Sequence, residues 1–170
     1  MADKPFSPSN QVNIIWEKDA ETGQAVCVLL NSVLFWAHFF LLKEQSHARY
    51  ADIRFYDLHE MPLYPPVSFR PALAEIYNKY KSRDFPSFRE QLDEFYDDRL
   101  TEYWESQGPE KRQDRFWRVL NQPVKPSEIR INFDREVCAA IGLDVTNSDL
   151  TEIYEVMAKE IILTRRLIKG

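Results

Sequence analysis

Residues 25–42, AVCVLLNSVLFWAHFFLL, constrain the fold more than any other part of the sequence. The stretch has no charged residue and only three polar ones, Asn31, Ser32 and His38. As a single helix it is roughly 27 Å long and apolar on every side, so protein or lipid must enclose it. Mid-helix Asn31 and His38 would be penalised in hydrocarbon, and the flanking charges show no positive-inside bias. We therefore predict a central buried helix, and we expect no membrane among the partners.

The rest of the sequence predicts amphipathic helices that surround this central one. Apolar side chains recur at helical spacing in residues 68–83, 88–104, 116–120, 135–141 and from 147 onward. We expect Asp134 to cap the fourth of these helices, and Gly142 with Leu143 to close it as a Schellman motif. Residues 146–149, TNSD, are expected to open the last helix.

A small β element is predicted near the N-terminus. Val12, Ile14 and Trp16 alternate along a short run that predicts a strand, and residues 17–23 predict a turn. The expected fold class is therefore mainly α, with this one β element. We expect residues 1–66 to hold the strand, the central helix and a polar link, residues 67–170 to form a helical C-terminal part, and both to belong to one domain.

The charge and the cysteine content limit the classes of protein to which the chain can belong. The net charge is −5, and residues 1–83 hold nine basic and nine acidic residues, against thirteen and eighteen in residues 84–170. A surface for nucleic acid is therefore expected in the first half. Cys27 and Cys138 lie 111 positions apart, which gives neither a disulfide framework nor a zinc spacing. They are predicted to be buried, reduced thiols of a cytoplasmic protein.

Catalytic signatures are missing from the sequence. It contains no GxGxxG, GxxxxGK[ST], HExxH or GxSxG pattern. The three histidines, His38, His47 and His59, have no cysteine or carboxylate at metal-ligand spacing, so no metal site is predicted. We interpret His38 as a hydrogen-bonded histidine of the core. Catalysis by this chain alone is not expected.

Two stretches resemble a known family. Residues 29–40, LLNSVLFWAHFF, are followed by a basic polar link and an extended segment that ends in proline. This order resembles the C-terminal target-recognition region of adenine-specific DNA methyltransferases, in the class that includes fused type II restriction–methylation enzymes. Residues 131–161 are similar to the short helix, Gly-Leu close and final helix that end many such chains. Together the two stretches cover about a quarter of the sequence.

The sequence also departs from that family. The glycine loop for the methyl donor and the NPPY-type catalytic tetrapeptide are missing, and PLYPP (62–66) lacks the asparagine that would hold the adenine amino group. The resemblance therefore implies a non-catalytic fragment, split subunit or solo recognition domain. S-adenosylmethionine is expected on a separate catalytic domain or subunit, which would be a partner together with DNA.

The polar link after the central helix holds the candidate DNA-binding residues. Lys43, Arg49 and Arg54 could meet phosphates, while Gln45, His47 and Arg49 carry donors or acceptors for base edges. The alternative hypothesis is a helical protein–protein interaction or regulatory module without a nucleic-acid role. A salt series separates the two, because phosphate contacts make log affinity fall linearly with log salt.

Overall fold

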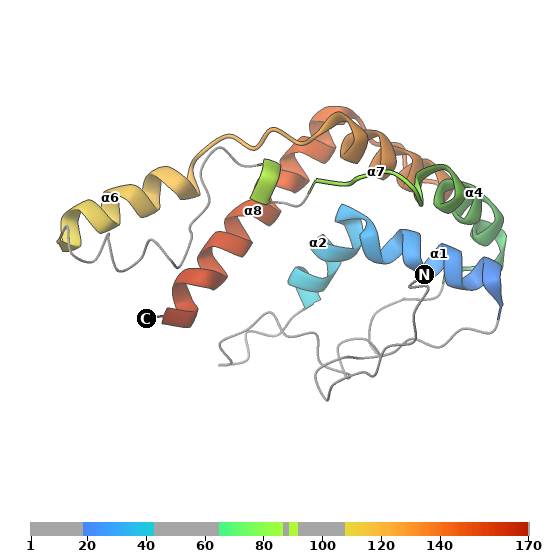
Figure 1. Ribbon diagram of the computed structural model, residues 1–170, viewed down its shortest axis with the longest axis horizontal. Coiled ribbons are helices and arrows are strands. Elements are labelled where there is room, and N and C mark those ends of the chain that lie inside the picture. Colours follow the sequence, from blue (N-terminus) through green and yellow to red (C-terminus); the bar gives the residue numbers. More distant parts are fainter. Residues whose placement is uncertain (1–18, 43–64, 87–88, 92–107, 170) are drawn as a thin grey trace.

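Helices make up the described part of the chain (Figure 1). The computed structural model describes residues 19–42, 65–86, 89–91 and 108–169. Within these ranges the elements are α1 (Ala20–Asn31), α2 (Val33–Leu42), the 3-10 turn η1 (Val67–Phe69), α4 (Arg70–Tyr80), the 3-10 turn η2 (Arg89–Gln91), α6 (Pro109–Leu120), α7 (Glu128–Ala140) and α8 (Asn147–Lys169). The mainly α prediction is confirmed. The predicted strand at 12–16 lies outside the described residues, and the described ranges contain no strand.

Helix α7 lies between two apolar clusters. On one side, Phe133 and Val137 pack with α1 and α4, in a cluster completed by Ala25, Val28, Leu73, Ile76 and Tyr80. On the other side, Ile131 and Cys138 pack with α2 and α8, in a cluster completed by Val33, Val124, Leu150, Tyr154, Met157 and Ala158. One face of α7 therefore packs against α1 and α4, and the opposite face packs against α2 and α8. This packing joins the N-terminal and C-terminal parts of the chain.

A third and smaller cluster holds α6 against α8. It contains Phe116, Val119 and Leu120 of α6 and Ile162 of α8, with Leu163 packed beside it. Figure 1 shows α6 at one end of an elongated molecule, with α1 and α4 at the other end. Helix α8 runs from the α7 region toward the α6 end, and is the element common to both.

The predicted central helix is wrong in three respects. It is two helices, α1 and α2, separated at Ser32, and α1 begins at Ala20, where the sequence predicted a turn. The Asp19 carboxylate caps α1 by accepting a hydrogen bond from the Thr22 amide at 3.0 Å, which accounts for the earlier start. Protein does not enclose α1 on all sides either, because Cys27 and Asn31 are exposed. The prediction of a buried thiol is therefore wrong for Cys27 and confirmed for Cys138.

The C-terminal helices follow the sequence predictions except at one residue. The Schellman close of α7 is confirmed, because Leu143 N–H donates to the Cys138 carbonyl at 2.8 Å and Gly142 has a φ of 81°. The start of α8 is also confirmed, with Thr146 and Asp149 in a reciprocal capping box. Asp134, by contrast, does not cap α7. That helix begins two turns earlier, after Ser127.

The remaining predicted elements are only partly described. Helix α4 reproduces the prediction for 68–83, with Leu73, Ile76 and Tyr80 buried on one face. Helix α6 contains the predicted 116–120 segment but begins at Pro109. Most of the predicted helix at 88–104 lies outside the described residues. None of the described helices combines the length and the apolarity that a bilayer span requires.

Candidate functional site: a buried carboxylate at a helix break

Ser32 closes one helix and opens the next. Its backbone is extended, with φ −79° and ψ 150°, so the helical hydrogen-bond ladder stops there. Its N–H and its Oγ both donate to the Leu29 carbonyl, at 3.0 and 2.8 Å. The same Oγ accepts a hydrogen bond from the Phe35 amide of α2 at 3.3 Å. One side chain thus satisfies polar backbone groups at the end of α1 and at the start of α2.

The Asp134 carboxylate holds the first amide of α2. Its Oδ1 accepts from Val33 N–H at 2.8 Å, and its Oδ2 accepts from the Tyr154 hydroxyl at 2.6 Å. Asp134 is 0% exposed. The residue in the middle of α7 therefore caps a different helix, 101 positions away in the sequence, and also binds α8.

Arg130 lies one turn before Asp134 and contacts the other side of the break. Its Nη1 donates to the Asn31 carbonyl at 3.2 Å, and its Nε donates to the Pro86 carbonyl at 3.1 Å. Its guanidinium lies over the Phe85 ring, 4.7 Å from the centroid. Because a helix is partially negative at its C-terminus and partially positive at its N-terminus, the cation suits the end of α1 and the anion suits the start of α2. We call Arg130, Asp134 and Ser32 the break clamp.

Burial dominates the electrostatics of the clamp. It raises the pKa of Asp134 from 3.8 to about 6, against the opposing effects of the hydrogen bonds from Tyr154 and Val33 and of the Arg130 charge. Burial, with the neighbouring Asp134 charge, also raises the pKa of the Tyr154 hydroxyl. The same two causes raise the pKa of the Cys138 thiol to about 11, so this thiol stays protonated at neutral pH.

Contacts from α4 and η2 fix the position of α7 beneath the break. Glu136 Oε1 accepts hydrogen bonds from Lys79 Nζ at 2.6 Å and from the Tyr80 hydroxyl at 2.9 Å, which joins α4 to α7. Gln91, itself buried, accepts from the Ser127 amide at 2.9 Å just before α7 begins. These bonds restrain the helix that carries the clamp at its start and near its middle.

The clamp positions helices and does not act on a substrate. Both Asp134 oxygens already accept hydrogen bonds, and neither Asp134 nor Cys138 is exposed to solvent. Within the described ranges, no three His, Cys, Asp or Glu side chains gather where a metal ion could bind. The chemistry of the site is therefore that of a fixed pair of helix ends.

The structure does not test the residues predicted to bind DNA. Lys43, Gln45, His47, Arg49 and Arg54 all lie between 43 and 64, outside the described residues. His38 is placed on α2, but its buried Nε2 has no hydrogen-bond partner in the described part of the chain. The prediction of a hydrogen-bonded histidine is therefore not met at that atom.

Sequence reasoning missed the role of Arg130 and Asp134. A signal was present, because two opposite charges stand at i and i+4 with Ile131, Phe133 and Val137 around them. A charged residue inside a buried stripe requires a partner, and that partner is often distant in the sequence. No protein-family model, curated protein or solved structure matches this chain.

Proposed function

We infer that the chain is a non-catalytic DNA target-recognition or DNA-clamping domain of an adenine-specific DNA methyltransferase. Its partners would be DNA and a catalytic domain or subunit that binds S-adenosylmethionine, in the cytoplasm. One observation carries this proposal. The two stretches that resemble the family, 29–40 and 131–161, meet at the hydrogen bond between Val33 N–H and Asp134.

That hydrogen bond joins the two stretches that carry the resemblance. The Asn31–Ser32 pair of the first stretch forms the helix break, and α7 and α8 of the second stretch hold it. Two separate sequence similarities therefore belong to one structural unit. The break sets the orientation of α2, whose last residue, Leu42, directly precedes Lys43 in the sequence.

Fluorescence anisotropy with duplex DNA at several salt concentrations tests the proposal. The variant K43A/R49A/R54A removes three positive charges from the link, and each lost phosphate contact should flatten the slope of log affinity against log salt by about 0.9. The matched control K81A/R83A/K125A removes the same charge from the described surface around α4 and before α7. We expect a change of up to about three units in the link variant and little change in the control. Absence of DNA binding by the wild type at low salt would contradict the proposal.

Calorimetry tests the non-catalytic part of the proposal. The isolated chain should give no heat of binding with S-adenosylmethionine, because it lacks the glycine loop that would hold the methyl donor. A clear micromolar isotherm would contradict this expectation and would make the chain itself a candidate enzyme.

A second candidate function is a helical protein-interaction module without a nucleic-acid role. The observation that favours it is Trp117 on α6, which is 50% exposed although it is a large aromatic residue. Tryptophan is enriched among the residues that carry most of the binding energy at protein interfaces. If this function is correct, W117A abolishes binding to the partner protein, whereas the affinity of any DNA complex stays independent of the link charges.

A further inference from the structure

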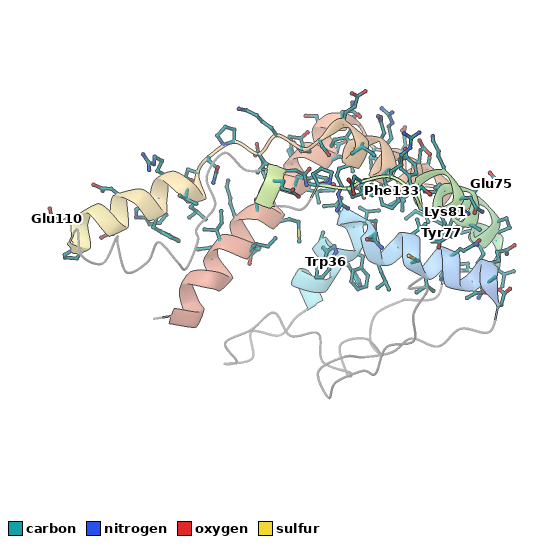
Figure 2. The ribbon with its side chains drawn as sticks, in the orientation of Figure 1. Trp36, Glu75, Tyr77, Lys81, Glu110 and Phe133 are labelled. Atoms are coloured by element: carbon teal, nitrogen blue, oxygen red, sulfur yellow. The ribbon has the colours of Figure 1, made fainter. Side chains whose placement is uncertain are left out.

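Helix α2 is attached most firmly at its first residue. Among the six α2 residues whose burial the structure describes, 33–38, only Val33 is buried, and the other five are partly buried. Leu34, Trp36 and Ala37 pack at the edge of the cluster that Val33 shares with α7 and α8. Figure 2 shows Trp36 on the part of α2 that extends away from α7. The position of α2 therefore depends strongly on the contacts at its start.

The break at Ser32 provides a hinge at that same point. Ser32 is the single residue between α1 and α2, and its backbone is extended. If the Val33 amide leaves Asp134, it can bond to the Leu29 carbonyl, which is its acceptor in a continuous helix. Residues 24–42 contain no glycine or proline that would prevent this. Detachment of α2 therefore does not require the Val33 amide to lose every acceptor.

A buried polar atom on α2 also favours detachment. His38 Nε2 is buried, and it has no hydrogen-bond partner among the described residues. A buried nitrogen without a partner is destabilising, because it has lost its hydrogen bonds to water. Detachment would return this atom to solvent. Part of the free energy lost when the apolar side of α2 leaves its cluster is thereby recovered.

Asp134 can couple the position of α2 to pH. The described groups that face its carboxylate come from three helices: Val33 N–H from α2, the Tyr154 hydroxyl from α8, and the Arg130 guanidinium and the Cys138 thiol from α7. Residues 29–32, at the adjoining end of α1, have no titratable side chain. Burial outweighs the hydrogen bonds and the Arg130 charge, and it raises the pKa of Asp134 to about 6. Water that reaches the carboxylate when α2 leaves would lower this pKa again.

We propose that α2 is a releasable helix, which detaches from α7 and α8 about the Ser32 hinge more readily when the Asp134 carboxyl group is ionised than when it is protonated. In the released state α1, α4, α7 and α8 keep their contacts with one another. The inference goes beyond the proposed function and does not depend on it, because no DNA or catalytic partner takes part. It also differs from a loss of global stability, because one helix moves and the others stay packed.

The direction and size of the pH effect follow from linkage. In the released state the carboxyl group loses its proton near its ordinary pKa of 3.8, whereas in the docked state it loses it at about 6. The equilibrium constant for release therefore rises between about pH 4 and about pH 6 and is constant above that range. A difference of about two pKa units corresponds to a rise of about 100-fold.

Labelling of Cys138 with a thiol reagent measures release. Cys138 is 0% exposed and belongs to the cluster that α2 helps to cover, so it reacts only when the cluster opens. The C27A background removes the exposed thiol. The reaction rate with 4,4′-dithiodipyridine is divided by the rate of the urea-unfolded chain at the same pH, which corrects for ionisation of the thiol. We expect this ratio to rise about 100-fold from pH 4 to pH 7, and to be independent of pH in D134N.

A second probe separates release of α2 from global unfolding. V28C in the C27A/C138A background places one thiol in the cluster formed by α1, α4 and α7, where Val28 is 3% exposed. This thiol should react only in globally unfolded molecules, so its ratio should be at least about tenfold lower than that of Cys138. Equal ratios for the two probes would overturn the inference, because Cys138 would then be exposed only when the whole chain unfolds.

A matched pair of variants shows which helix moves. Leu34 of α2 and Ile153 of α8 are both partly buried against the same cluster. L34A should raise the Cys138 ratio roughly tenfold at every pH, because it weakens the docking of α2, whereas I153A should leave the ratio unchanged. Circular dichroism checks that each variant is folded. A rise in I153A but not in L34A would overturn the inference, because α8 would then be the helix that opens.

Two results of the pH series would also overturn it. The first is a pH dependence that D134N retains, since the response would then come from another group. The second is a ratio that falls as the pH rises. His38 is the other titratable side chain in the described part of α2, and it would give this opposite sign, because its positive charge at low pH favours exposure to water.

Discussion

The region around α7 and the end formed by α6 and α8 are built in opposite ways. Helix α7 packs on both faces, and two of its charged residues, Arg130 in the first turn and Asp134 in the middle, bond to the ends of other helices. Helix α6 rests on one small apolar cluster that it shares with α8. The comparison teaches that two kinds of contact hold the helices in place. Around α7, buried charges fix the positions of helix ends, whereas at the other end an apolar cluster holds α6 against α8.

The largest expected effect comes from truncating an aromatic side chain in each region. Phe133 is 3% exposed, and its ring centroid lies 5.3 Å from that of Tyr80 and 5.0 Å from that of Phe85. F133A should lower the free energy of unfolding by about 4–5 kcal/mol, because three helices enclose the cavity. F116A should lower it by about 3 kcal/mol, because the smaller cluster can collapse further. Urea melts measure both, and equal losses would break the comparison.

The second prediction concerns the pH dependence of stability. In the folded protein the pKa of Asp134 is about 6, against an ordinary value of 3.8. Between these values the folded state keeps a proton that the unfolded chain has lost, so the free energy of unfolding falls as pH rises through about 6. The difference of about two units corresponds to about 3 kcal/mol, present below about pH 4 and lost above about pH 6.

The variant D134N isolates this contribution. Its amide can accept from Val33 N–H and donate to the Tyr154 oxygen, and it does not titrate. Urea melts from pH 4 to 8 should therefore show a wild-type free energy that declines relative to D134N by about 3 kcal/mol. Parallel curves for the two proteins would mean that the carboxylate is not buried in a folded α7 region.

A smaller effect is expected at Arg130. R130Q removes the donation to the Asn31 carbonyl, the contact with the Phe85 ring and a positive charge near Asp134. We expect a loss of about 1–2 kcal/mol and a further rise in the pKa of Asp134. R135Q is the matched control, because exposed Arg135 bonds only to polar side chains on its own helix and at the start of α8 among its described contacts. Losses of equal size would remove Arg130 from the clamp.

The smallest effect is expected at Trp117. This residue is 50% exposed, and its described ring contact is with the adjacent Phe116 at 5.6 Å. W117A should change the free energy of unfolding by no more than about 0.5 kcal/mol. A thermal melt measures this change. A loss above about 2 kcal/mol would show that the α6 end is packed as firmly as the α7 region.

Local signals in the sequence predicted local features of the fold. Gly142 and Leu143 gave the Schellman close, and Thr146 with Asp149 gave the start of α8, because such motifs complete their hydrogen bonds within a few residues. Asp134 was misassigned as a cap for α7, because its two partners lie 101 and 20 positions away. Pairings at that separation depend on tertiary packing, and no local pattern specifies them.

The candidate site shows the same limit. Asn31 and Ser32 were visible as polar residues in an apolar run, but an apolar composition on both sides favoured one continuous helix. The extended backbone at Ser32 becomes favourable because an anion from α7 satisfies the next amide.

The central claim is that the Asp134 carboxylate of α7 holds the start of α2. Nuclear magnetic resonance of the Val33 amide tests it most directly, with a pH titration from 4 to 8 and hydrogen exchange at neutral pH. We predict that the Val33 amide proton titrates with a midpoint near pH 6 and exchanges slowly, and that D134N abolishes the titration. A Val33 amide that exchanges freely, or whose shift is independent of pH in the wild type, would contradict the claim.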